Sequence, residues 1–574
     1  MIHTVDPRQE RLFDPFEGII PPAGRRIIAD GWQGLLRHVL LNVMPVSELA
    51  NHFSATLGAP TKELYSMAAF VFLADFFGWN NDEAVQAYLF RTDVQYALNL
   101  EPGATICTRT LERYQQLFRD NDLATRVFEE VTAKLITALD LDVSRQRLDS
   151  THVFSDMATF GRTKLMAVAI KRFLTQLQRH DPDAHTALPE DFRKRYAPAQ
   201  SRLFADAKDA DARARCRQQA AEDLHFLITR FADAADHNHR STYKVLITIF
   251  GQQCELKDAA VIVKAKTGGD CVQNPSDPDA TYDGHKGPGY QVQIAETCVP
   301  ENIVQLITAV LPQTACEPDS AAVAPILDQL ENAGRRPDEM LADTAYTSDE
   351  NVQEAASRGI DMIGPVPGRT PDTDPAALSA DDFALDERTG TITACPAGHA
   401  PTSSSYDAAT TTYRVDMPAS ACAACPFRKQ CPIETTRDGM FTYTFTDKDR
   451  RLAGRRVEER TDVFKRRYSL RSGIESTNSG LKNRLGLGQL RVRGRGSVFR
   501  VIVHKVTGWN ILRAAASATL RARVRAAVGR TLKGSESGQT GRPFAFFFWL
   551  PDGLRLASWS FHGDSARHGA FRAA

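Results

Sequence analysis

The sequence of 574 residues lacks the features of a membrane or secreted protein. No apolar run approaches the roughly 18 residues that span a bilayer. The best candidate, MAAFVFLADFF, is interrupted by Asp75, and the N-terminal MIHTVDPRQERLFD has no signal-peptide pattern. Six of the ten cysteines show no motif spacing, as is typical of reduced structural thiols. These absences predict a cytoplasmic protein with no membrane partner.

The chain also lacks net charge, but the zero total hides a strong asymmetry. Residues 448–500 contain 16 basic and 5 acidic residues, whereas residues 371–387 contain six acids and no base. A basic block of this kind predicts a polyanionic partner, most plausibly nucleic acid. A solvated helical face is the alternative interpretation of the charge run alone.

The pattern of apolar residues predicts an α/β protein with several domains. Residues 36–138 have helical periodicity and form an all-helical domain after an N-terminal extension at 1–35. Strands alternate with helices over 139–161, 241–369 and 447–515, which indicates one discontinuous α/β core. The other predicted segments are a charged helical insertion at 162–240, a cysteine-containing insertion at 370–446 and a poorly ordered tail at 516–574.

Three carboxylates stand where an α/β core would bring them together. Asp149 in LDST and Asp343 in LADTAY each follow a short apolar run that reads as a strand, and strand ends face the crevice where ligands bind. Either Asp alone is more often a turn or cap residue. With Glu475 they form the oxygen donor set that two Mg²⁺ ions about 4 Å apart require for in-line phosphoryl transfer.

Glu475 lies in YSLRSGIESTNSGLKNRLG, residues 468–486. Tyr468, Arg471, Glu475 and Lys482 project within roughly 60° of one another on a helix, so they form a polar stripe. Such a stripe faces either water or a polar concave surface.

These motifs, in this order, resemble those of bacterial insertion-sequence transposases with a DDE catalytic core. The last segment matches their Tyr-x₂-Arg-x₃-Glu-x₆-Lys pattern at every named position. The likeness covers roughly residues 36–515 and is greatest to the 1182 group of insertion sequences, which the broad IS-five class also resembles.

The resemblance implies a ribonuclease-H-like core in which Asp149, Asp343 and Glu475 bind two Mg²⁺ ions, with Mn²⁺ as an alternative. It implies cleavage at transposon ends followed by attack of the freed 3′-hydroxyl on target DNA. The expected partners are double-stranded DNA of the terminal repeats and of the target, and a second copy of the chain, because two ends are synapsed. Such a bacterial protein is expected to associate with the nucleoid.

Four side chains are assigned to DNA within this scheme. Arg471 and Lys482 are expected to hold phosphates, the first as a fork and the second as a point charge. Tyr468 is expected to hydrogen-bond a phosphate or to stack on a sugar or base. Tyr346 is a candidate contact for a terminal base, with a buried packing role as the alternative.

The four remaining cysteines predict a structural Zn²⁺ site. Cys395 is followed after 26 residues by Cys422-x₂-Cys425-x₅-Cys431, and a Cys-x₂-Cys element places two thiolates on one metal. In a reducing compartment a metal is favoured over disulfides. A zinc-ribbon-like fold is therefore expected, with His399 as a substitute ligand.

Two other functions remain open at this point. One is a non-catalytic zinc-ribbon DNA-binding protein derived from a transposase, and the other is a Mg²⁺-dependent nuclease without strand transfer. The intact carboxylates at all three positions favour an active transposase.

Overall fold

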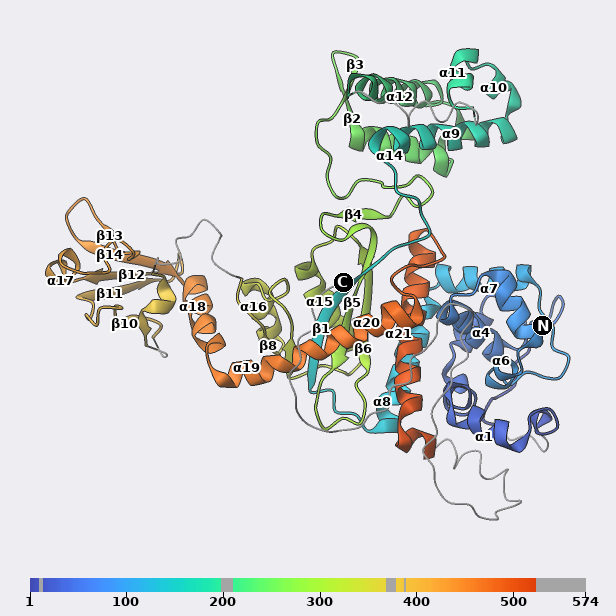
Figure 1. The fold of residues 1–574 in the computed structure, drawn as a ribbon, viewed down its shortest axis with the longest axis horizontal. Coiled ribbons are helices and arrows are strands. Elements are labelled where there is room, and N and C mark those ends of the chain that lie inside the picture. Colours follow the sequence, from blue (N-terminus) through green and yellow to red (C-terminus); the bar gives the residue numbers. More distant parts are fainter. Residues whose placement is uncertain (10–13, 198–209, 368–377, 387–388, 523–574) are drawn as a thin grey trace, which may run out of the picture.

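A computed structural model describes residues 1–9, 14–197, 210–367, 378–386 and 389–522 of the chain. A central mixed sheet lies between an N-terminal helical domain and a small β-rich domain, and a helical domain projects beyond one end of the sheet (Figure 1). The mixed α/β class predicted from the sequence is confirmed. Among these residues, no helix is both long and apolar enough to cross a membrane.

The central sheet has the strand order β4-β5-β1-β7-β8, with β6 paired to β5 beside β4. Strand β1 runs antiparallel to β5 along residues 146–153 but is parallel to β7 only at residues 145–147. The far half of β1 therefore has a free edge beyond the end of β7. The bounds of the strands are β1 (Arg145–Val153), β4 (Thr281–Asp283), β5 (Gly287–Thr297), β6 (Ile307–Thr314), β7 (Glu339–Leu341) and β8 (Asp361–Ile363).

Helices cover both faces of this sheet. Apolar residues of α15 (Val323–Asn332) and α16 (Asp349–Ser357) pack with Leu148 on one face. On the other face, α8 (Leu123–Leu139), α20 (Gly473–Leu485) and α21 (Arg495–Ala516) enclose the second core. The sheet is thus buried on both sides, as the sequence alternation of strands and helices predicts.

The N-terminal domain is helical, as predicted. Helix α4 (Leu64–Phe77) is apolar on nearly every side because neighbouring helices bury all of its faces, and it ends at Gly78 in the left-handed conformation. A capping box at Asn80 begins α5. The other segments are η1 (Pro15–Glu17), α1 (Pro22–Asp30), α2 (Trp32–Leu35), η2 (Leu36–Leu40), η3 (Leu41–Val43), α3 (Val46–Ala50), α5 (Asn81–Phe90), α6 (Thr92–Ala97) and α7 (Thr108–Asp120).

The helical insertion is longer than predicted. Residues 241–253, assigned from the sequence to the α/β core, form α14 (Ser241–Gln253), whose Leu246 and Ile249 pack in the core of the insertion. Of the β-branched residues in this helix, Ile249 is buried in that core, whereas Ile247 is exposed. The remaining segments are α9 (Arg162–His180), α10 (Pro182–Thr186), α11 (Glu190–Arg195), α12 (Ala210–Arg230), α13 (Ala235–Asn238), β2 (Cys254–Lys257) and β3 (Ala260–Val263).

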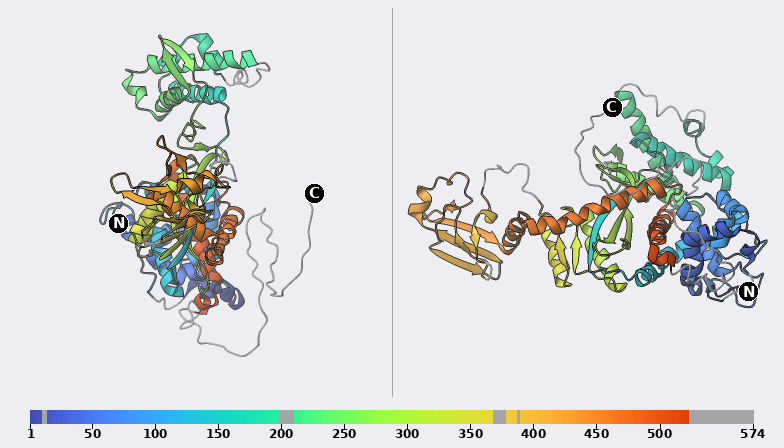
Figure 2. Two further views of the ribbon diagram at one scale, coloured as in Figure 1. Left: turned by 90° about the vertical axis from the view of Figure 1, so that its left-hand side faces the viewer. Right: turned by 60° about the horizontal axis from the view of Figure 1, so that its bottom comes forward.

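The cysteine-containing insertion is built on a sheet with the order β11-β12-β14-β13. Helices α18 (Asp447–Glu459) and α19 (Asp462–Ser469) then lead back to α20 on the central sheet, and two further views show the same path (Figure 2). The other segments are β9 (Ala384–Leu385), β10 (Ile392–Ala394), β11 (Ser403–Asp407), β12 (Thr412–Met417), α17 (Ala419–Ala423), β13 (Glu434–Thr435) and β14 (Phe441–Thr446), with short turns η5 (Asp319–Ala322), η6 (Ala380–Asp382) and η7 (Leu470–Ser472). Most of the tail predicted at 516–574 lies outside the described residues.

Candidate functional site

Asp149 lies on β1 where that strand has passed the end of β7. Its side chain is mostly buried against α20, and the amide of Asn478 donates a hydrogen bond of 3.0 Å to Oδ2. Burial raises the pKa of Asp149 to about 6, against the opposite influence of Arg471. A cation beside the carboxyl group favours its ionised form.

Asp343 lies two residues after β7, in a turn that is stabilised by its own local hydrogen bonds. Its Oδ1 accepts a hydrogen bond of 2.9 Å from the backbone N–H of Ala345, and its carbonyl accepts one from the backbone of Tyr346. Because β1 and β7 are parallel neighbours, Asp149 and Asp343 meet at the free edge of β1. The sequence placed both at strand ends, and the structure puts Asp149 within β1 and Asp343 just after β7.

Glu475 lies in the first turn of α20, which runs across β1. The helix lies close to the strand because residue 473 is glycine: a Cβ there would come within 2.0 Å of the guanidinium of Arg147. The side chain of Glu475 is 68% exposed, so it is free to turn toward the two aspartates.

One guanidinium joins all three carboxylates. Nη2 of Arg471 is 3.2 Å from Asp149 and 3.3 Å from Asp343, and Nη1 is 3.4 Å from Glu475. Although its burial has the opposite effect, these anions raise the pKa of Arg471. The three acids that the sequence singled out thus share one small space, which a cation already occupies. In this structure the cation is the guanidinium of Arg471, and the three acids are not arranged to hold a metal ion among the described residues.

The other predicted DNA contacts differ in their setting. Lys482 is exposed on α20, seven residues after Glu475. Tyr468 is half-buried, and its ring stacks on Phe464 at 5.6 Å between centroids. Tyr346 has no exposed surface, and its hydroxyl donates to the side chain of Gln293. The predicted contact between Tyr346 and a DNA base is therefore not available in this structure, because the ring is part of the core beneath the site.

Two residues that the sequence analysis missed hold α20 in place. The fully buried Glu296 on β5 accepts hydrogen bonds from Arg147 on β1, at 2.5 and 2.8 Å, and from Thr477 on α20, at 2.7 Å. It also pairs with Arg513 on α21. Asn478 is the second, since it donates to Asp149 from the next turn after Glu475. The only sequence signal for Glu296 is an acid at a buried position of an otherwise uncharged strand.

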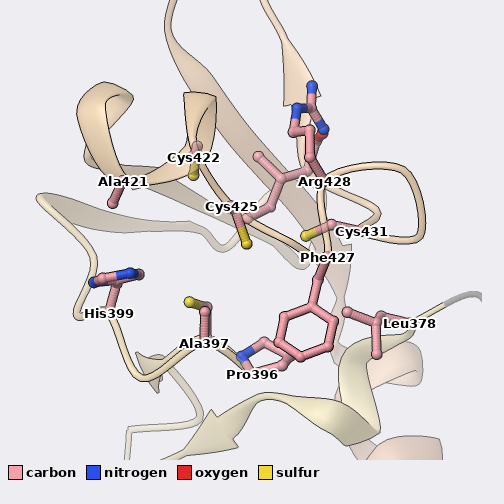
Figure 3. Close-up of a pocket in the computed structure, with 12 residues that line it drawn as sticks. Leu378, Pro396, Ala397, His399, Ala421, Cys422, Cys425, Phe427, Arg428 and Cys431 are labelled. Atoms are coloured by element: carbon pink, nitrogen blue, oxygen red, sulfur yellow. The ribbon is translucent and has the colours of Figure 1, made fainter.

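The four cysteines of the insertion converge on one small cavity. Cys395, Cys422, Cys425 and Cys431 line it together with His399. Figure 3 shows the sulfur atoms of Cys422, Cys425 and Cys431 directed toward a common space. Burial, and then the proximity of the other three thiols, raises the pKa of Cys422. Over the described chain, however, no group of three or more Cys, His, Asp or Glu side chains is arranged to hold a metal ion.

One comparison with known proteins gives a match, which covers part of the chain. Residues 394–515 match a family model described as a transposase DDE domain. This match supports a DDE transposase. It includes all four cysteines and the whole Tyr-Arg-Glu-Lys stripe, whereas Asp149 and Asp343 lie before it. No curated protein and no solved structure matches the chain.

Proposed function

We propose that the chain is a DNA transposase that cleaves the ends of its element and joins the freed 3′-hydroxyl to target DNA. The observation that carries this proposal is the meeting of Asp149, Asp343 and Glu475 around one cation. A ribonuclease-H-like arrangement of the core, and membership of the 1182 group, belong to the same proposal. The family match over residues 394–515 supports it and implies DNA binding.

The three carboxylates suit Mg²⁺, because hard cations prefer oxygen ligands and all three acids already share one cation, Arg471. Binding of the metal would require Arg471 to leave the carboxylates and their side chains to adjust. When bound, two such ions supply Lewis-acid stabilisation of the attacking and leaving oxygens. The residues of this chain orient the ligands and hold the elements that carry them. Asn478 orients Asp149, the Glu296 cluster holds α20 on the sheet, and Arg471 becomes free to pair with a phosphate once its carboxylates have another cation.

The cysteine cluster supports a structural Zn²⁺ ion in the insertion, held by Cys395, Cys422, Cys425 and Cys431. Thiolates are the ligands that Zn²⁺ prefers, and a closed set of four leaves no position for chemistry. The described arrangement requires side-chain adjustment to form that set. Purified wild-type protein should contain one equivalent of zinc that Cys425→Ser loses, while Cys107→Ser, at an exposed cysteine of the N-terminal domain, retains it. Metal-free wild-type protein with a folded insertion would contradict the assignment.

The catalytic proposal is tested with labelled DNA that carries the terminal repeats of the element, in Mg²⁺ and beside an unlabelled plasmid. Cleavage with joined product is the expected result. Cleavage alone indicates a nuclease, and binding alone indicates the non-catalytic alternative. Glu475→Gln should abolish cleavage, whereas Glu458→Gln, at an exposed acid on α18, should not. Full cleavage by Glu475→Gln would falsify the catalytic assignment.

A further inference from the structure

Helix α18 ties the cysteine-containing insertion to the segment that follows Asp343. The helix begins directly after β14, the last strand of the insertion, and lies beside α16 (Figure 1). Arg451 on α18 donates two hydrogen bonds, of 3.0 and 2.6 Å, to the carboxylate of Asp349 at the start of α16. Because Asp349 is 5% exposed and the contact is bidentate, this ion pair fixes α18 against α16.

Arg455, four residues further along α18, reaches the turn that contains Asp343. Its Nη1 donates a hydrogen bond of 3.1 Å to the carbonyl of Thr347, and its Nη2 donates one of 3.2 Å to the carbonyl of Gly364. Over the described residues Arg455 forms no ion pair, so its guanidinium is used for these two carbonyls. One guanidinium thus joins the segment after β7 to the segment after β8.

These two segments pack against each other around Asp343. A Cβ at Gly364 would be 2.2 Å from the carbonyl oxygen of Ala342, the residue before Asp343, and 2.7 Å from Cγ2 of Thr347. The hydroxyl of Thr347 is 2.5 Å from the carbonyl oxygen of Pro365, to which it donates, and 3.3 Å from that of Asp343. The backbone on both sides of Asp343 therefore rests on the segment after β8.

The hydrogen bonds inside the turn do a different task. Asp343 accepts from the backbone of Ala345 and Tyr346, which fixes the shape of the turn but not its place relative to α18 and β8. Arg455 supplies a connection to both. Its planar guanidinium fixes two donors relative to each other, and the ammonium group of a lysine does not. Since Thr347 has no exposed surface, its carbonyl would lose this partner without a ready replacement from water.

Resting on the proposed function of Asp343, we propose that Arg455 is a positioning residue for that carboxylate. It holds the turn of Asp343 in place from α18 and so sets the position of Asp343 relative to Asp149. Through Arg455, the cysteine-containing insertion becomes a support of the candidate site, although the guanidinium contacts backbone carbonyls and not the carboxylates.

The first test needs no DNA and measures hydrogen–deuterium exchange of the full chain. In Arg455→Gln, the amides of Ala345 and Tyr346 should exchange about tenfold faster than in wild type, because the turn loses two hydrogen bonds from a charged donor. Amides of α4 should keep their wild-type rates, which excludes global unfolding. Arg466→Gln, at an exposed arginine on α19, is the matched control and should leave the turn unchanged.

Arg455→Lys keeps the charge and guards against a variant that fails to fold. It should also speed exchange of the turn, because an ammonium group does not reproduce the paired donors. Wild-type exchange of the turn in both Arg455 variants would overturn the proposal.

The second test uses the labelled terminal-repeat DNA and separates positioning from DNA contact. Arg455→Lys should need more Mg²⁺ for half-maximal cleavage, whereas its affinity for the DNA in Ca²⁺ should equal that of wild type. Weaker DNA binding with wild-type exchange of the turn would make Arg455 a DNA contact and refute the positioning role. If wild type cleaves no DNA, the proposed function is wrong, and the exchange experiment still decides whether Arg455 holds the turn.

Discussion

The Glu296 cluster makes a strong prediction because it ties the helix of Glu475 to the sheet. Glu296→Gln keeps the shape of the side chain but removes the charge that Arg147 and Arg513 share. Both oxygens of Glu296 are used, one by Arg147 and the other by Thr477 and Arg513. An amide cannot accept on both sides, so one arginine or the threonine loses its acceptor.

The size of the expected loss of stability follows from the burial of the Glu296 and Arg147 side chains. Glu296 is fully buried and the side chain of Arg147 is 9% exposed, so the variant leaves an unpaired charge in the interior. Removal of one partner of a buried ion pair lowers the free energy of unfolding by about 3–5 kcal/mol. Since Arg513 is partly exposed, the lower end applies, about 3 kcal/mol. Because about 1.4 kcal/mol is a factor of ten, amides of α20 should exchange about 100-fold faster in hydrogen–deuterium exchange.

The measurement compares peptides that cover α20 in wild type, in Glu296→Gln and in a control. Glu331→Gln is the control, because Glu331 is 37% exposed and pairs with Arg358 at the surface. The Glu331→Gln substitution should change the stability by no more than about 1 kcal/mol. A displacement of α20 by about 1 Å should also slow cleavage about 100-fold. Wild-type exchange of α20 in Glu296→Gln would show that this cluster does not hold the helix.

Three other variants probe the supports of the site. Asp75→Asn leaves a buried arginine without its partner and should cost about 3–5 kcal/mol at pH 7. Although burial has the opposite effect, the neighbouring Arg500 and His504 lower the pKa of Asp75 to about 2, so in urea titrations the difference from wild type should shrink as the pH falls from about 4 to 2. Arg471→Gln removes the cation that competes for the carboxylates; the thermal shift caused by Mn²⁺ without DNA should increase, and an unchanged shift would contradict this role. Gly480→Ala places a Cβ 2.0 Å from Trp509 and should lower the stability by about 1–3 kcal/mol, whereas Gly454→Ala, in open space on α18, should raise it by about 0.5–1 kcal/mol in the same unfolding assay.

The fold could be predicted where local pattern and tertiary packing agree. The alternation in GYQVQIAET predicts β5, although both faces of that strand are buried, and the capping residue Asn80 predicts the start of α5. The pattern failed at residues 241–253. The buried residues there, Tyr243, Leu246 and Ile249, are three residues apart, which is a helical spacing, but the local content of β-branched residues resembles that of a strand.

The candidate site was likewise predictable only in part. The order of three acidic motifs is a sequence property, and it identified the carboxylates that the structure brings together. Whether Tyr346 faces a ligand or the core depends on how the turn after β7 folds, which no local pattern specifies. Glu296 and Asn478 act through contacts with residues 149 or more positions away, so their roles were invisible before the chain was folded.

The three carboxylates differ in exposure, and this difference indicates which of them depends on helix packing for its position. Asp149 is largely buried and accepts a hydrogen bond from Asn478, and Asp343 is fixed by a hydrogen bond within its own turn. Glu475 is mostly exposed, and within the described chain its ion pair is with Arg471. Its position is therefore set by α20 as a whole. That helix is fixed by Glu296 on the side of the sheet and by its packing on α21 behind it. Helix α21 is bound in turn to the N-terminal domain through the buried contacts of Asp75, so changes in that domain should reach the candidate site through Glu475 before they reach the aspartates.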